Sequence, residues 1–367
     1  MTPSSSLGEV VGLFLKLGFS GFGGPLVHFA LMETEAVERR RWLSKREFLD
    51  ALGLCQMLPG PASTQLGVYL SYLRAGLPGA LLGGCAFVLP GFLIMLGFSI
   101  LYGYTGSVPR VQGILGGIGP AVIAIIGLAA WKLARGAVSS WPLGALAALG
   151  FALTAFLRWD TALVLLICGG LWVAFRRSRR PRLLASLVPA LALAAPEVYA
   201  RLAWLFLKMG ALVYGGGYVI IPVVRREAVE RYGWISDRAF LDGLALGQVT
   251  PGPIVNLSAF VGYQAGGVVG AVIGAAAVFL PAFAVILAAI PLLDRLKRSP
   301  MMQAFLQGVN ATVVGAIVAA TLPLARGAIV GPLSGGIALA SLLLLWRFRV
   351  DTLWVVLGAG VLGFIVA

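Results

Sequence analysis

The chain has 367 residues, of which 59% are hydrophobic, and its mean hydropathy is +0.95. Only 28 Lys and Arg and 14 Asp and Glu are charged, too few polar side chains to cover a water-soluble globule, which excludes an ordinary soluble enzyme. The 49 glycines are typical of helices that pack closely in lipid. At about 20 apolar residues per span, there is room for about a dozen helices. The sequence therefore predicts an all-α polytopic membrane protein.

The formal net charge of +14 comes from basic residues scattered through short loops between apolar stretches. Such a distribution fits membrane lipids and the positive-inside rule, so lipids are expected partners and nucleic acid is not. Three cysteines, Cys55, Cys85 and Cys168, lie far apart, and there is one histidine, so neither a metal site nor a cofactor is expected. A homodimer is left open.

The apolar stretches form two series in chain order, and each stretch is taken as one membrane segment. The first series runs over 9–31, 48–73, 77–104, 111–134, 141–157 and 160–175. The second series runs over 201–223, 240–264, 267–291, 302–325, 328–346 and 351–366. Between them lies a basic linker, 176–200, with a possible connecting helix. The prediction is about 12 to 13 membrane segments, including broken or re-entrant helices.

The two series are copies of each other. The sequence FLKLG at 14–18 recurs as FLKMG at 206–210, and at the same offset of 192 EAVER at 35–39 meets EAVER at 227–231. Half of the positions between 14 and 61 are identical, and after a one-residue slip Pro90 meets Pro281. We therefore expect an N-terminal repeat, 1–175, and a C-terminal repeat, 201–367.

Loop charges favour opposite orientations of the two repeats. The loop after the third stretch carries Arg110 in the first repeat but Arg295, Lys297 and Arg298 in the second. The next loop reverses the bias, with Lys132 and Arg135 against Arg326 alone. Because Lys and Arg in short loops favour the cytoplasm, this pattern predicts inverted-topology repeats. Whether the second stretch of each repeat crosses the membrane or is re-entrant is left open.

The first candidate site is a Pro-Gly-Pro motif inside an apolar stretch of each repeat. Two prolines around a glycine break a helix, which lipid tolerates only where the freed backbone groups face protein or a water-filled cavity. The second half-helix then presents its positive N-terminus, which suits an anion near the midplane. The alternative is a loop used for packing, but recurrence at one register favours function. The candidate binding residues are Gln56, Pro59, Gly60, Pro61, Ser63 and Thr64, with Gln248, Pro251, Gly252, Pro253 and Asn256.

Two further features could serve an anion. Gly23 and Gly24, matched by Gly215 and Gly216, could form a nest of N–H groups or a helix-crossing point. Lys16 and Lys208 lie within the first helix of each repeat, where a charge is expensive; they belong either to an anion pathway or to side chains that reach the interface.

The EAVER segments precede a tryptophan and a serine in both repeats. This pattern predicts an interfacial turn followed by a helix that the serine caps, with solvated or salt-bridged charges. His28 has no counterpart, since Ile220 stands at its place, and is interpreted as structural.

Taken together, F-x-K-x-G-x-x-x-F-G-G-P, E-A-V-E-R-x-x-W-[LI]-[ST], F-L-D-x-L-x-L-x-Q-x-x-P-G-P and their repetition resemble the chromate ion transporter family in its long, two-domain form. The resemblance implies export of chromate across the cytoplasmic membrane of a prokaryote by a secondary mechanism such as antiport, with sulfate as a similar ligand. One departure is Gly217, which stands where the first repeat has Pro25.

No Walker-type phosphate loop is present in the sequence, so a secondary active transporter rather than an ATP-driven pump is expected. One alternative is a transporter or channel for another anion. An integral-membrane lipid-phosphate enzyme is less consistent with the sequence because it needs clustered carboxylates or a histidine nucleophile. Asp50 and Asp242 are single carboxylates in separate repeats, so no catalytic residue is assigned.

Overall fold

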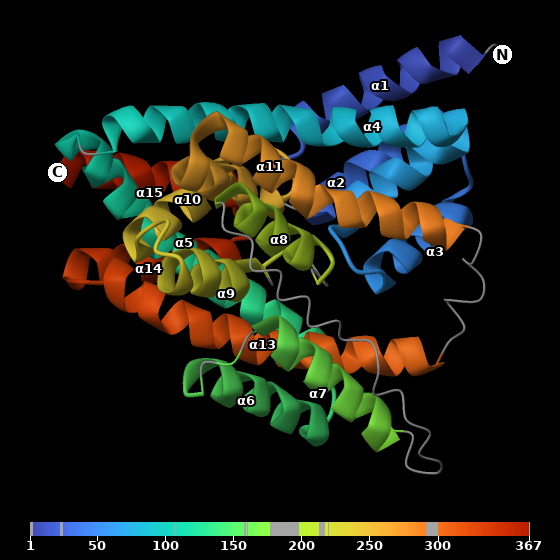
Figure 1. Cartoon of the computed structure of the whole chain (residues 1–367). Helices are drawn as coiled ribbons and strands as arrows, with labels where there is room; N and C mark the ends of the chain where they lie inside the picture. The colour runs from blue at the N-terminus through green and yellow to red at the C-terminus, as the bar shows by residue number, and fades with distance from the viewer. Residues whose placement is uncertain are drawn as a thin grey trace.

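The computed structural model describes residues 3–22, 25–106, 108–157, 159, 161–176, 198–212, 217–218, 220–290 and 300–366. Within these ranges the chain is helical and has no strand, which confirms the predicted all-α class (Figure 1). In the first repeat the helices are α1 (Pro3–Ser20), α2 (Pro25–Glu33), η1 (Thr34–Arg39), α3 (Lys45–Met57), α4 (Ala62–Thr105), α5 (Pro109–Ala137), α6 (Trp141–Ala155) and α7 (Thr161–Arg176).

In the second repeat they are α8 (Val198–Gly210), α9 (Ile220–Val224), η2 (Arg225–Arg231), α10 (Asp237–Val249), η3 (Ile254–Asn256), α11 (Leu257–Ala289), α13 (Pro300–Ala328), α14 (Pro332–Trp346) and α15 (Thr352–Val366). Four of the described helices, α4, α5, α11 with the preceding η3 turn, and α13, are long and apolar enough to cross a membrane, and four shorter apolar helices accompany them. Together these helices make the chain a multi-pass membrane protein.

The first apolar stretch is a hairpin of two helices, not the single segment that its hydropathy predicts. Helix α1 ends at Ser20, and α2 runs back along it. Lys16 of α1 pairs with Glu35 at 2.9 Å, and Glu9, two turns earlier in α1, reaches Arg40 at 3.5 Å. Hydropathy could not detect the reversal because both arms are apolar.

Helix α4 is a second hairpin, folded at Ala75 and Gly76. Gly76 has a φ of +63°, a conformation open to glycine at little cost. On either side of the fold the two arms touch: a Cβ on Gly79 would overlap the backbone of Ser71. A short arm, 62–75, therefore lies against a long arm, 77–105.

The Pro-Gly-Pro loop of the first repeat is the tip of a third hairpin, formed by α3 and the short arm of α4. Helix α3 begins beside Trp42, and at the far end of the short arm Arg74 stacks over the Trp42 ring at 5.9 Å. Arg74 also pairs with Glu9 at 2.8 Å, close to the start of α1. The chain thus enters and leaves this hairpin at the same end of the bundle.

The second repeat has the same fold. Helix α11 is folded at Gly266 and Gly267, and the φ and ψ of Gly267, 63° and −154°, match the 63° and −155° of Gly76. Gly262 and Gly270 lie in contact across this fold. The kinks correspond at an offset of 191.

The long arms of α4 and α11 run antiparallel. Gly84, near the fold of α4, lies against Phe283. Farther along the same arm, Gly103 lies against Tyr263, which is next to the fold of α11. The fold of one hairpin therefore lies at the opposite end from the fold of the other.

The C-terminal helices of the two repeats are exchanged. Helix α5 packs against α14 and α15, and α13 packs against α6 and α7. Close glycine contacts hold these crossings: Gly117 meets Gly363, and the equivalent Gly308 meets Trp172. Figure 1 shows α6 and α7 beside α13. Neither repeat packs as a separate body.

Candidate functional site at the hairpin tips

The hairpin tips of the two repeats meet inside the bundle. The Gly252 N–H donates a hydrogen bond to the Gly21 carbonyl at 2.9 Å, which links the Pro-Gly-Pro loop of the second repeat to the α1–α2 tip of the first. Gly91, on the long arm of α4, is so close to Pro251 and Asn256 that a Cβ there would overlap both.

The reciprocal contact occurs at the other loop. A Cβ on Gly60 would lie 3.1 Å from the Cα of Ala282, on the long arm of α11. Gly91 follows Pro90 and Ala282 follows Pro281, which are equivalent prolines. Each Pro-Gly-Pro loop is therefore positioned by the long arm of the other repeat.

The two loops share a backbone shape that produces buried helix starts. Gly60 and Gly252 have φ values of +123° and +96°, which side-chain-bearing residues rarely adopt. The residue after each glycine is an extended proline, Pro61 or Pro253, and neither cap has a side-chain hydrogen bond. The first N–H groups of such a helix have no intrahelical partner and present a positive dipole end.

A buried amide side chain lies against each loop glycine. Gln65 donates from Nε2 to the Pro59 carbonyl at 2.6 Å, and the Asn256 amide lies 3.2 Å from where a Cβ on Gly252 would be. Gln65 is fully buried, and Asn256 is 2% exposed. They correspond at an offset of 191, the register of the kinks.

Gln65 is the residue that sequence reasoning missed. The repeats align at an offset of 192 up to the loops, which places Thr64 opposite Asn256. The slip to 191 falls directly after the loops, where the second repeat forms the η3 turn (Ile254–Asn256) and the first begins its α-helix at Ala62. An alignment that changes from an offset of 192 to 191 directly after Pro61 and Pro253 would have placed Gln65 opposite Asn256.

Several buried polar atoms here have no hydrogen-bond partner among the described residues. They are Gln65 Oε1, Thr64 Oγ1, Ser258 Oγ and both amide atoms of Asn256. A buried polar atom without a partner costs about 1 to 3 kcal/mol, so such groups in native proteins usually face a ligand or water. Asn256 Nδ2 and the hydroxyls of Thr64 and Ser258 can donate to an oxyanion beside the two helix starts, whereas Gln65 Oε1 and Asn256 Oδ1 can only accept a hydrogen bond.

The other predicted residues are placed unequally. Ser63 is buried in the first turn of α4, whereas Gln56 is exposed on α3. Gln248 is half-buried at the end of α10, and its buried Nε2 atom has no hydrogen-bond partner among the described residues. Gly23, Gly24, Gly215 and Gly216 lie outside the described residues.

Both predicted lysines form ion pairs with the first glutamate of the EAVER segments. Lys16 lies 2.9 Å from Glu35, and Lys208 lies 3.4 Å from Glu227. In both repeats the last arginine of the segment also pairs with this glutamate: Arg39 lies 2.9 Å from Glu35, and Arg231 lies 3.2 Å from Glu227. These contacts confirm the salt-bridged interpretation of the glutamates.

The carboxylate of Glu35 is buried, and its environment favours the charged form. The Lys16 hydrogen bond is the main cause that holds the pKa of Glu35 below its ordinary value. Directly after these segments, Ser44 and Ser236 cap α3 and α10, and Ser44 forms a capping box with Glu47. The predicted serine caps are therefore confirmed.

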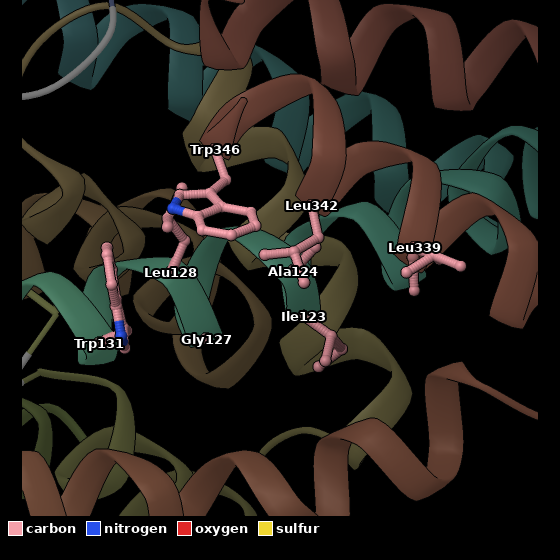
Figure 2. A pocket seen from close by; sticks show the side chains of 9 residues that line it. Ile123, Ala124, Gly127, Leu128, Trp131, Leu339, Leu342 and Trp346 are labelled. Carbon is pink, nitrogen blue, oxygen red and sulfur yellow. The ribbon is translucent and has the colours of Figure 1, made fainter. Parts of the chain in front are cut away.

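A groove of about 580 Å³ lies elsewhere, between α5 and α14. Figure 2 shows that Trp131, Trp346, Leu342 and Ile123 line it. Its lining carries no charged side chain, and both helices also present large apolar residues to the outside. This groove suits an acyl chain and not an oxyanion.

Comparison with known proteins supports the pattern of the repeats. The family model described as Chromate transporter matches residues 8–173 and 200–364. The chain is 33% identical to a chromate transport protein of Cupriavidus metallidurans, over 99% of this chain and 94% of that protein. It is 35% identical to a chromate transport protein of Pseudomonas aeruginosa, over 99% of this chain and 93% of that protein.

A probable chromate transport protein of Synechococcus elongatus is 34% identical, over 88% of this chain and 86% of that protein. No solved structure matches the chain. The family model covers both repeats and the matched relatives extend over nearly their full length. The chain therefore belongs to the chromate transporter family.

Proposed function

We propose that this protein is a secondary active transporter that exports chromate across the plasma membrane of a prokaryote and also accepts sulfate. Relatives of nearly equal length are named chromate transport proteins, which supports the substrate class. Chromate and sulfate are tetrahedral dianions of similar size, so a site made of helix starts and neutral donors binds both. Chloride, a monovalent ion, competes poorly at the same site.

The observation that carries the proposal is the pair of buried amides at the two loops. Gln65 and Asn256 come from opposite repeats: Asn256 Nδ2 has no partner among the described residues, and Gln65 Nε2, which donates to the Pro59 carbonyl, carries a second hydrogen that can be donated. In our proposal the oxyanion lies among these amides, Thr64, Ser63 and the helix starts after Pro61 and Pro253. Gln248 borders the same region at the end of α10, while Gln56, exposed on α3, contacts the ion during entry or exit.

The proposed mechanism uses inverted repeats. The antiparallel arms of α4 and α11 support a pseudo-two-fold axis in the membrane plane, with the loops near the midplane. The hairpins that carry the loops are re-entrant in this arrangement, because each enters and leaves at one end of the bundle. Backbone without helical hydrogen bonds is then covered by protein.

We further propose that the ion-pair clusters form the positive ends of the anion pathway. Glu35 is shared by Lys16, Arg39 and Arg40, and Glu9 by Arg40 and Arg74, so two carboxylates neutralise only part of the positive charge of four cations. The Lys208 cluster occupies the equivalent place in the second repeat. Such clusters raise the local anion concentration without contacting the bound ion.

The experiment that tests the function is uptake of labelled chromate into inside-out vesicles that contain the protein. We expect uptake above that of empty vesicles, inhibition by excess sulfate, and little inhibition by chloride at equal ionic strength. If chloride competes as strongly as sulfate, the protein has a general anion pathway and not a site specific for dianions. Vesicles that take up neither chromate nor sulfate would refute the proposed substrate class.

A further inference from the structure

The equivalent helices α3 and α10 have different surroundings. Helix α10 packs against α4, α5, α13 and α15, whereas the main contacts of α3 within the described residues are with α2 and α4. The difference shows at equivalent positions: Leu49 on α3 is 50% exposed, and Leu241 on α10 is 6% exposed. The equivalent helices are therefore packed differently in the two repeats.

The residue after each of these leucines is an aspartate. Asp50 is exposed on α3, and Asp242 is only 6% exposed on α10. The Tyr102 hydroxyl, from the long arm of α4, donates a hydrogen bond to Asp242 Oδ2 at 2.8 Å. The same carboxylate thus lies in two opposite environments within one molecule.

Few groups around Asp242 favour its charged form. Arg238, one turn earlier on α10, is exposed, and Tyr263 of α11 lies beside Gly103, next to Tyr102. Most ionisable groups of the other helices packed on α10 are exposed or already paired. The exposed groups are Arg110, Lys132 and Arg135 of α5 and Arg326 of α13, α15 carries none, and the paired groups of η2 are Arg225 with Glu230 and Glu227 with Arg231. Arg226 of η2 is half-buried, and its Nη1 atom has no hydrogen-bond partner among the described residues.

A carboxylate that is buried beside one neutral donor is more stable when it binds a proton. On α3 the equivalent Asp50 is exposed to water, which stabilises the ionised form of a carboxyl group. Proton binding and the packing of α10 are therefore linked, since each favours the other.

We propose that Asp242 is the proton-binding site that couples oxyanion transport to a proton gradient, a role that rests on the transport function proposed above. Its carboxyl carries the proton while α10 is packed and releases it when α10 moves to the exposed position that α3 now occupies. Asp50 is the matching carboxylate of the opposite conformation. The offset of 191 places Leu293 opposite Tyr102, so the hydroxyl that covers Asp242 belongs to one repeat alone.

The test uses the full-length protein in proteoliposomes and two measurements on each variant. The first is exchange of labelled chromate at equal pH on both sides, which needs binding and movement but no net proton flow. The second is chromate flux with an imposed proton gradient. We expect the gradient to accelerate flux through the wild type. Asp242→Asn should keep exchange but reduce that acceleration at least tenfold. Asp351→Asn, an exposed carboxylate that caps α15, is the matched control and keeps the acceleration.

Tyr102→Phe provides the second variant, in case Asp242→Asn does not fold. It removes a donor from the ionised carboxylate, so the pH profile of gradient-driven flux shifts to higher pH by about one unit relative to the wild type. The wild type at each pH corrects for protonation of chromate itself.

Full gradient acceleration in Asp242→Asn, or an unchanged pH profile in Tyr102→Phe, would overturn the proton site. Wild-type exchange that does not respond to a proton gradient would also overturn it and leave the transport function standing. Absence of exchange in the wild type would instead refute the proposed function.

Discussion

The Gly252 N–H and the Gly21 carbonyl form a 2.9 Å hydrogen bond between the two repeats. Gly252 belongs to a Pro-Gly-Pro loop and Gly21 to the α1–α2 tip, so the bond fixes two hairpin tips against each other. A loop held in this way can present its helix start at a defined place, which a loose loop cannot.

Substitution of the two loop glycines should have unequal effects. Both glycines have a positive φ, but a Cβ on Gly60 would also lie 2.7 Å from the Gln65 amide and 3.1 Å from Ala282, whereas the nearest atom to a Cβ on Gly252 is the Asn256 amide nitrogen, at 3.2 Å. The backbone strain alone costs about 1 to 2 kcal/mol. We expect Gly60→Ala to lower both the thermal midpoint in detergent and chromate uptake more than Gly252→Ala. Equal effects would show that the contact with Ala282 is unimportant.

Acid should weaken the Glu35 cluster. Since the pKa of Glu35 is held below its ordinary value, chiefly by Lys16, its contribution to stability is fully present above that ordinary value of 4.5 and is lost as the pH falls through the lowered value. Glu35→Gln should cost about 1 kcal/mol at neutral pH, because its cationic partners are partly exposed. The measurement is the thermal midpoint as a function of pH.

Glu38→Gln is the control for that measurement, since Glu38 is exposed on the same turn. It should leave the pH dependence of the midpoint unchanged. If Glu35→Gln keeps the same loss of stability in acid as the wild type, Glu35 is not its source.

The sequence predicts the class of this fold, its duplication and the interruption at Pro-Gly-Pro, because these follow from composition and proline chemistry. It does not predict that 9–31 is a hairpin, since both arms are equally apolar and the reversal depends on contacts such as the one between Glu9 and Arg40. The sequence also does not predict that α5 packs against α14 and α15 of the other repeat, because the equivalent helices α6 and α7 of its own repeat have similar sequences.

The candidate site was predicted in part. The loops and Asn256 follow from the repeat, whereas Gln65 depends on where a one-residue slip falls, and only the backbone locates it. Burial could not be predicted either: Asp50 and Asp242 align, yet one is exposed and the other is covered by Tyr102.

Opposite orientation of the repeats predicts opposite labelling of equivalent positions. Glu38→Cys and Glu230→Cys are equivalent and exposed, one in each EAVER segment. In a background that lacks the three native cysteines, an impermeant thiol reagent should label one from outside the cell and the other from inside. Labelling of both from the same side would exclude the inverted arrangement.

The most direct measurement is calorimetric binding of chromate to the purified protein with Gln65→Ala, Asn256→Ala and the double variant. Loss of an amide donor to a dianion typically costs about 1.5 to 3 kcal/mol, so each substitution should weaken binding roughly ten- to a hundredfold.

Gln112→Ala, an amide on α5 that is not among the contacts at the hairpin tips, is the control and should bind normally. The account predicts that both single variants bind weakly and that the double variant binds more weakly still, with all three proteins folded by thermal melting. Wild-type affinity in the folded double variant would contradict a site at the two Pro-Gly-Pro loops.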